Sequence, residues 1–186
     1  IKENLVSYGI DEKKIHIIPS CVDIDLFMPR TDHNPLKESW GLQKKFVVLY
    51  AGNVGFSQGL ETVLDAAAIL SKKSRIEFVI VGDGVNLETL KQKARNDDLH
   101  NVQFHEFLPY QEVPDLYAAA DACLVTMKPE LVVESVPSKT YTIMASGKPV
   151  VATVHIESEV GYLLQEANCG ICVPPKDSQA LSEAIL

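Results

Sequence analysis

Six segments of the chain share one pattern, in which a short apolar run rich in β-branched residues ends at Gly, Asp or Pro and a helical pattern follows. The apolar runs predict strands at 46–51, 76–81, 102–104, 122–126, 150–152 and 171–173. The helical spacing predicts helices at 60–70, 87–98, near 113–119, 138–146, 158–167 and from 178 onward. Strands that are apolar on both faces and alternate with helices indicate a parallel sheet covered on both sides. The predicted fold class is α/β, a doubly wound parallel sheet of about six strands.

A different pattern precedes this core. Residues 2–8 read as a helix end and 14–18 (KIHII) as a short strand, and an irregular connection punctuated by Pro19, Pro29 and Pro35 then leads to Trp40. A linker that enters the sheet domain from elsewhere has this composition. We therefore expect residues 1–44 to be the end of a preceding domain and an interdomain linker.

Both ends of the chain look cut. The first residue is Ile1 rather than Met, and Leu186 falls inside an apolar-periodic stretch. We expect residues 45–186 to form a Rossmann-like domain truncated at its C-terminus, within a longer polypeptide.

Charge and hydropathy exclude several classes of protein. With 17 Lys+Arg against 25 Asp+Glu, the net charge of −8 disfavours nucleic acid and anionic lipid as main partners. No apolar run approaches the roughly 18 residues of a membrane span. We expect a cytoplasmic protein, in which any association with the inner face of a membrane would come through the part of the longer polypeptide that lies outside this chain.

Glycines cluster where the first two strands of the core end. Gly52, Gly55 and Gly59 follow the first, and Gly82 and Gly84 follow the second. Ligands of doubly wound sheets bind beyond the carboxyl ends of the strands, where glycine permits close approach of the backbone. Glycine also simply makes tight turns, so both interpretations remain open. The spacing matches neither G-x-G-x-x-G nor a Walker loop.

The loop before residue 138 carries more information. Pro137 and Ser138 are helix-start signals, so Ser138 and Lys139 would lie at the positive end of a helix dipole. Free N–H groups, a hydroxyl and an ammonium would then converge as at a diphosphate site. A capped surface helix with an exposed lysine fits the same residues equally well.

Two further patterns favour structure over chemistry. Cys169 and Cys172 have the spacing of a redox or half-zinc motif, but no second Cys/His pair accompanies them, so we expect packed thiols. Asp23 and Asp25 match a two-aspartate metal pattern but sit among turn residues, so we expect a structural role. No metal and no cofactor are predicted.

The residues resemble a known family. Five blocks occur in order: IHIIPSCVDIDLFMP, YAGNVGFSQGLETVLDAA, FVIVGDGVNLETLKQKA, VQFHEFLPYQEVPDLYAAADACLV and ESVPSKTYTIMASGKPVVAT. Together they are similar to the carboxy-terminal half of a family-4 (group 1) glycosyltransferase of the GT-B fold. YAGN, QGLE and VPSK resemble most the subgroup that includes N-acetyl-L-fucosamine transferases of surface-polysaccharide biosynthesis.

The resemblance implies that this half binds a nucleotide-sugar donor for a retaining, metal-independent transfer, while the missing half binds the acceptor. It implies that Glu134 lies near the donor sugar and that Lys139 faces the diphosphate. A second family glutamate, which holds the ribose, is replaced by Thr142. Two family cations at the diphosphate are replaced by Asn53 and Gln58.

The resemblance places the base pocket at residues 106–108. A lone phenylalanine such as Phe107 is nevertheless more often a core residue than a base-stacking one. The expected site has Glu134 and Lys139 as catalytic residues, and as donor-binding residues Gly52, Asn53, Gly55, Gln58, Gly82, Phe107, Leu108, Ser135, Val136, Pro137, Ser138 and Thr142.

The predicted function is donor binding in transfer of a sugar, from a uridine diphosphate sugar, to a glycan or lipid-linked acceptor. Preorganised donors would stabilise the charge that develops on the leaving diphosphate. Because two cations and one glutamate of the family pattern are missing, a non-catalytic nucleotide-binding α/β domain remains an alternative. A sugar-nucleotide epimerase of GT-B architecture is another.

Overall fold

The computed structural model describes residues 2–18, 20–30, 33–73, 75–129 and 136–186. Six parallel strands form one sheet in the order β3-β2-β1-β4-β5-β6. The strands are β1 (Phe46–Ala51), β2 (Ile76–Val81), β3 (Val102–His105), β4 (Ala122–Thr126), β5 (Val150–Thr153) and β6 (Gly170–Val173). The predicted α/β fold is confirmed, with each strand within one residue of its predicted bounds.

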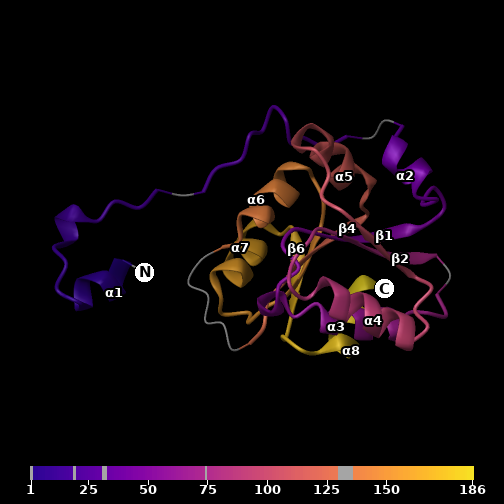
Figure 1. Ribbon diagram of the computed structural model, residues 1–186. Helices are drawn as coiled ribbons and strands as arrows, with labels where there is room; N and C mark the ends of the chain where they lie inside the picture. Colours follow the sequence, from indigo (N-terminus) through magenta and orange to yellow (C-terminus); the bar gives the residue numbers. More distant parts are fainter. Residues whose placement is uncertain (1, 19, 31–32, 74, 130–135) are drawn as a thin grey trace.

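Helices cover both faces of the sheet (Figure 1). One face carries α3 (Glu61–Ile69), α4 (Leu87–Asn96) and α8 (Ser178–Ile185). The other carries α2 (Pro35–Ser39), α5 (Val113–Ala119), α6 (Ser138–Ala145) and α7 (Glu159–Ala167). Three short 3₁₀ turns are η1 (Glu12–Lys14), η2 (Phe56–Gln58) and η3 (Tyr110–Glu112). No helix in the described part of the chain is long and apolar enough to cross a membrane.

The alternation of side chains along the strands creates two separate cores. In β1, Val48 and Tyr50 join the core beneath α3, whereas Val47 and Leu49 join the core beneath α5, α6 and α7. All four are at most 2% exposed. Period-2 alternation with apolar residues on both sides explains why the strands appear in the sequence as continuous apolar runs.

The strand predicted at 14–18 is wrong. Residues 12–14 form η1, and residues 15–18 have no regular structure. A strand needs a neighbour to accept and donate its backbone hydrogen bonds, and no described strand lies beside this segment. Nearby α1 (Lys2–Ser7) has no buried residue and lies apart from the sheet in Figure 1.

Residues from 20–30 and 33–44 contribute apolar side chains, Phe27 and Leu42 among them, to the core beneath α5, α6 and α7, and they include a helix that we did not predict. α2 begins at Pro35. The preceding residue, Asn34, is its N-cap, and the Asn34 side-chain oxygen accepts a hydrogen bond from the N–H of Lys37. An Asn–Pro pair is a recognised helix start, so the signal was present in the sequence. Asp115 of α5 anchors the segment by an ion pair with Arg30 at 2.6 Å and by its carbonyl, which accepts from the Asn34 amide at 2.7 Å.

The strand order reverses between β1 and β4, which are neighbours in the sheet although β2 and β3 intervene in the sequence. Loops on either side of such a switch point diverge and leave a crevice at the carboxyl ends of the strands. The loop after β1 and the first turn of α6 meet at this point.

Candidate functional site

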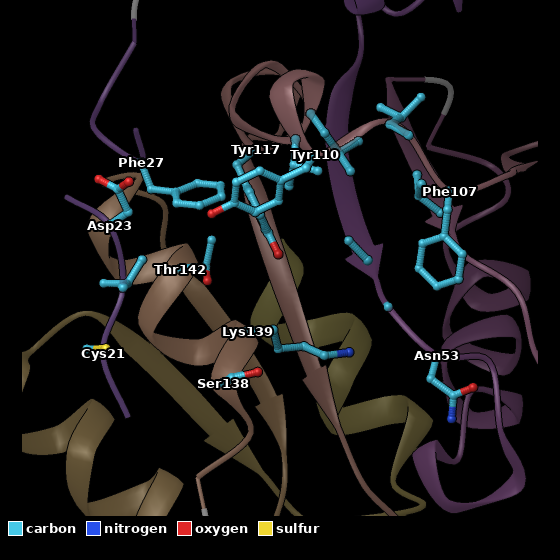
Figure 2. A pocket seen from close by; sticks show the side chains of 17 residues that line it. Cys21, Asp23, Phe27, Asn53, Phe107, Tyr110, Tyr117, Ser138, Lys139 and Thr142 are labelled. Atoms are coloured by element: carbon cyan, nitrogen blue, oxygen red, sulfur yellow. The ribbon is translucent and has the colours of Figure 1, made fainter. Parts of the chain in front are cut away.

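A cavity of about 460 Å³ opens at the switch point (Figure 2). Its walls come from the ends of β1 and β2, the segment 107–117, the start of α6 and residues 21–27. Of the predicted site residues, seven line it: Gly52, Asn53, Phe107, Leu108, Ser138, Lys139 and Thr142. The structure therefore brings together residues up to 90 positions apart in the sequence.

The loop after β1 is held against the loop after β2 by backbone hydrogen bonds. The N–H of Gly52 donates a hydrogen bond of 2.9 Å to the backbone carbonyl of Val81, and the N–H of Val54 donates one of 2.8 Å to the backbone carbonyl of Asp83. Gly82 has φ +150°, and a Cβ there would overlap the carbonyl oxygen of Gly52. Gly82 does not line the cavity. It allows the two loops to lie in contact, so the glycine provides packing beneath the site.

Gly52 itself faces α6 across the cavity. It has φ +138°, and a Cβ at this position would lie 2.8 Å from Nζ of Lys139. The Lys139 ammonium thus occupies the space that a side chain at position 52 would need. Gly52 and Lys139 lie at the same edge of the sheet, as the sequence predicted.

Lys139 is the one lysine or arginine among the described residues that line the cavity. Its Nζ lies 3.9 Å from the centroid of the Tyr50 ring. Burial lowers the pKa of Lys139 to about 8, from an ordinary value of 10.5. No ion pair with a carboxylate of the described residues compensates the loss of hydration. An ammonium in this setting favours an anionic ligand.

α6 adds further donors at the same place. Its N-cap residue, Pro137, provides no side-chain hydrogen bond to the first turn. Ser138 is exposed, and its hydroxyl lies beside Lys139 at the cavity wall (Figure 2). Uncapped N–H groups of a helix N-terminus attract anions. The interpretation of Lys139 as an exposed lysine on a capped surface helix is therefore wrong.

Two predicted residues of the first loop lie elsewhere. The Gln58 side-chain oxygen accepts from the N–H of Gly55 at 3.1 Å and from the Ser57 hydroxyl at 3.0 Å. Gln58 thereby closes the loop on itself, and neither it nor Gly55 lines the cavity. Asn53 does line it and is exposed.

The structure separates the two interpretations of Phe107. Its side chain is 58% exposed and lines the cavity, so the expectation of a core residue is wrong. Figure 2 shows Phe107 on the side of Asn53, across the cavity from Thr142. Leu108 also lines the cavity and packs against the core.

Sequence reasoning missed one end of the cavity. Phe27 meets the rings of Tyr110 and Tyr117 edge to face, with centroids 5.9 and 6.2 Å apart. Phe27 and Tyr117 are each 5% exposed, and burial raises the pKa of Tyr117. This aromatic cluster comes from three segments whose contact no local pattern reveals. The one sequence feature that could have indicated this cluster is the large apolar side chain of Phe27 within a turn-rich linker.

Asp23 also lines the cavity, but its carboxylate has a structural role. One oxygen accepts from the N–H groups of Asp25 and Leu26 at 3.0 and 3.1 Å. This is the turn role that we expected. In the described part of the chain no three His, Cys, Asp or Glu side chains gather as a metal site would require.

The profile of the family "Glycosyl transferases group 1" matches residues 32–186. This chain belongs to the group 1 glycosyl transferases. It is 33% identical over 141 residues to a Pseudomonas aeruginosa protein named "Probable glycosyltransferase WbjE", covering 76% of this chain and 35% of that protein. It is 31% identical over 184 residues to an Escherichia coli (strain K12) protein named "Putative colanic acid biosynthesis glycosyl transferase WcaI", covering 97% of this chain and 45% of that protein.

Solved structures show the same fold. HepE of Anabaena, crystallised with UDP-glucose, superposes with a TM-score of 0.79 at 24% identity, covering 99% of this chain and 50% of that chain. WaaG, described as a glycosyltransferase involved in lipopolysaccharide biosynthesis, gives 0.77 at 19% identity, covering 97% and 49%. This group 1 glycosyl transferase chain spans about a third to a half of the length of the proteins it matches. The chain therefore has the fold of about half of each of these GT-B glycosyltransferase structures.

The remaining predicted residues of this group 1 glycosyl transferase lie beyond the cavity wall or outside the described residues. Val136 and Pro137 precede α6 without lining the cavity. Glu134 and Ser135 lie outside the described residues, so their predicted roles stay predictions.

The two cysteines with the spacing of a redox or half-zinc motif are packed thiols, as the sequence predicted. Cys169 and Cys172 are half-buried free thiols packed against the core, and burial raises the pKa of both.

Proposed function

We propose that this chain is the donor-binding half of a retaining glycosyltransferase that takes its sugar from a nucleotide diphosphate sugar, with uridine as the base. The acceptor, a glycan or lipid-linked molecule, would bind the other half of the polypeptide. Membership of the group 1 family supports the class of reaction. The surface-polysaccharide subgroup that includes N-acetyl-L-fucosamine transferases is part of the same proposal.

The observation that carries the proposal is the Lys139 ammonium. It lies inside the cavity, against the Gly52 backbone and beside the N-terminus of α6, without a carboxylate partner among the described residues. A diphosphate placed there would receive the ammonium, the Ser138 hydroxyl and backbone N–H groups together. These groups would also stabilise the charge that develops when the diphosphate leaves. The proposed reaction uses these donors and no metal.

Apolar and aromatic side chains line the cavity together with Lys139, which suits a ligand with a charged centre and a flat base. Phe107 and Leu108 belong to this lining, as does the aromatic cluster of Phe27, Tyr110 and Tyr117. Thr142 lies nearer the aromatic cluster, one turn of α6 beyond Lys139 (Figure 2). HepE was crystallised with UDP and with UDP-glucose, which supports uridine as the base.

Calorimetric titration with UDP, UMP and uridine tests the proposal. We expect wild type to bind UDP more tightly than UMP, and UMP more tightly than uridine. Lys139→Met keeps the aliphatic stem but removes the charge, so UDP affinity should fall about tenfold or more, as loss of a charge-assisted hydrogen bond requires. Uridine affinity should stay within about twofold of wild type.

A matched control is Lys72→Met. Lys72 is exposed and follows α3, at the opposite edge of the sheet from the cavity. The Lys72→Met substitution removes one positive charge from the chain, as Lys139→Met does, but leaves the cavity unchanged, so UDP affinity should not change. Equal affinity of wild type for UDP and uridine, or equal UDP affinity of wild type and Lys139→Met, would contradict the proposal.

A further inference from the structure

Tyr50 contacts two parts of the site, the Lys139 ammonium of α6 and the loop after β1. It occupies the fifth position of β1 and is fully buried in the core beneath α3. The face of its ring lies 3.9 Å from Nζ of Lys139. Its hydroxyl donates a hydrogen bond of 2.7 Å to the carbonyl oxygen of Asn53. One side chain therefore contacts both the α6 ammonium and the loop after β1.

An ammonium removed from water needs a compensating partner. Lys139 has no carboxylate in that role among the described residues, and burial alone accounts for the lowering of its pKa. The negative face of an aromatic ring is the partner that the structure provides. Unlike a carboxylate, a ring does not neutralise the cation, so the charge stays available for an anion in the cavity.

The contact also fixes where the ammonium lies. Gly52 provides the space, because a Cβ there would be 2.8 Å from Nζ, and the Tyr50 ring packs against the same ammonium. The Tyr50 hydroxyl holds the next peptide of the same loop through Asn53. The position of the charge and the position of the loop are therefore set by the same residue.

We propose that Tyr50 is a positioning residue for the diphosphate site: its ring holds the Lys139 ammonium against the Gly52 backbone, and its hydroxyl locks the loop after β1 to that arrangement. Tyr50 does not line the cavity, so it acts through Lys139 and the loop rather than on the ligand. This inference rests on the proposed function, because it assigns Lys139 to the diphosphate.

Tyr50 could instead be an ordinary core residue, and a double-mutant cycle separates the two roles. We expect Tyr50→Leu, which keeps an apolar side chain but removes the ring, to lower UDP affinity about fivefold to tenfold. In a Lys139→Met background the same change should alter UDP affinity by less than about twofold, because no ammonium remains to be positioned. Tyr50→Phe keeps the ring and should bind UDP within about threefold of wild type.

A measurement on the unaltered chain covers the case in which Tyr50→Leu fails to fold. A ring face 3.9 Å from Nζ should shift the Lys139 side-chain proton resonances upfield from those of the exposed lysines, with Lys139→Met giving the assignment. Equal loss of UDP affinity in both backgrounds, or no upfield shift in wild type, would overturn the positioning role. If Lys139→Met binds UDP like wild type, the proposed function falls and this inference falls with it.

Discussion

The two ends of the cavity are built in different ways. The polar end consists of Gly52, Ser138 and Lys139, which lie directly after a strand or in the first turn of a helix. The aromatic end consists of Phe27, Tyr110 and Tyr117, which come from the linker, η3 and α5 and meet by edge-to-face packing. Backbone geometry creates the first, and side-chain packing creates the second.

The difference extends to stability. At the polar end a half-buried cation has no ionic partner among the described residues, which opposes folding and favours an anionic ligand. At the aromatic end Phe27 and Tyr117 remove large apolar surfaces from water and stabilise the fold. Substitutions at the two ends should therefore separate effects on binding from effects on stability.

The largest effect is expected at the aromatic end. Phe27→Ala removes a 5%-exposed ring from contact with two tyrosines, and the free energy of unfolding should fall by about 3 kcal/mol. Chemical denaturation measures this change. Phe56→Ala is the matched control, since Phe56 is 55% exposed and its loss should cost less than about 1 kcal/mol. Similar losses in both variants would show that residues 20–30 contribute little to the fold.

At the polar end, we expect the largest loss of stability from a substitution at the backbone contact between Gly82 and Gly52. Gly82→Ala places a Cβ against the Gly52 carbonyl oxygen at a left-handed φ, and the free energy of unfolding should fall by about 2–3 kcal/mol. Gly41→Ala separates the two causes, because Gly41 has φ +69° but nothing within 4 Å of the added Cβ. It should lose only about 1 kcal/mol. Equal losses would mean that the contact between the loops is unimportant.

The pH dependence of UDP binding should report on the polar end of the cavity alone, because Lys139 lies at that end. Because the pKa of Lys139 is about 8, the ammonium loses its proton as pH rises, and UDP affinity should fall about fivefold to tenfold between pH 7 and pH 9. Lys139→Met should lack this dependence, and so should uridine binding to wild type. A flat profile for UDP in wild type would exclude Lys139 as the anion's partner.

The same lowered pKa has an opposite effect on stability. Between about pH 8 and pH 10.5 the unfolded chain binds a proton at Lys139 that the folded chain has released. The contribution of Lys139 to the free energy of unfolding should therefore increase with pH across this window. Subtracting the unfolding profile of Lys139→Met from that of wild type isolates this contribution, and a falling difference would contradict the burial of the ammonium.

The smallest effect on stability is expected at Phe107. Its ring is 58% exposed, so Phe107→Ala should change the free energy of unfolding by less than about 0.5 kcal/mol. If the ring stacks on the base, UDP and uridine should lose affinity by the same factor, of about fivefold or more. Loss of affinity for UDP alone would assign Phe107 to the diphosphate or the sugar instead.

Local patterns predicted the sheet well because each strand is apolar on both faces and each following helix shows its own periodicity. The run FVVLYA became β1 with the predicted bounds, and Val113–Ala119 became α5. The segment KIHII is also rich in β-branched apolar residues but forms no strand. Its apolar residues Ile17 and Ile18 are 73% and 88% exposed. A strand depends on neighbours that a local pattern does not contain.

The sequence by itself determined the doubly wound fold, the family resemblance and the placement of Gly52 and Lys139 at one edge of the sheet, because strand runs, helix periodicity and helix starts are local features with fixed consequences for the backbone. Only the tertiary structure decided that Lys139 lies over the Tyr50 ring, that Phe107 is exposed and that Phe27 closes the cavity with two tyrosines. These outcomes depend on which distant side chains meet. Burial, the pKa of an ammonium and the shape of a pocket are set by those encounters, and no single segment of the chain encodes them.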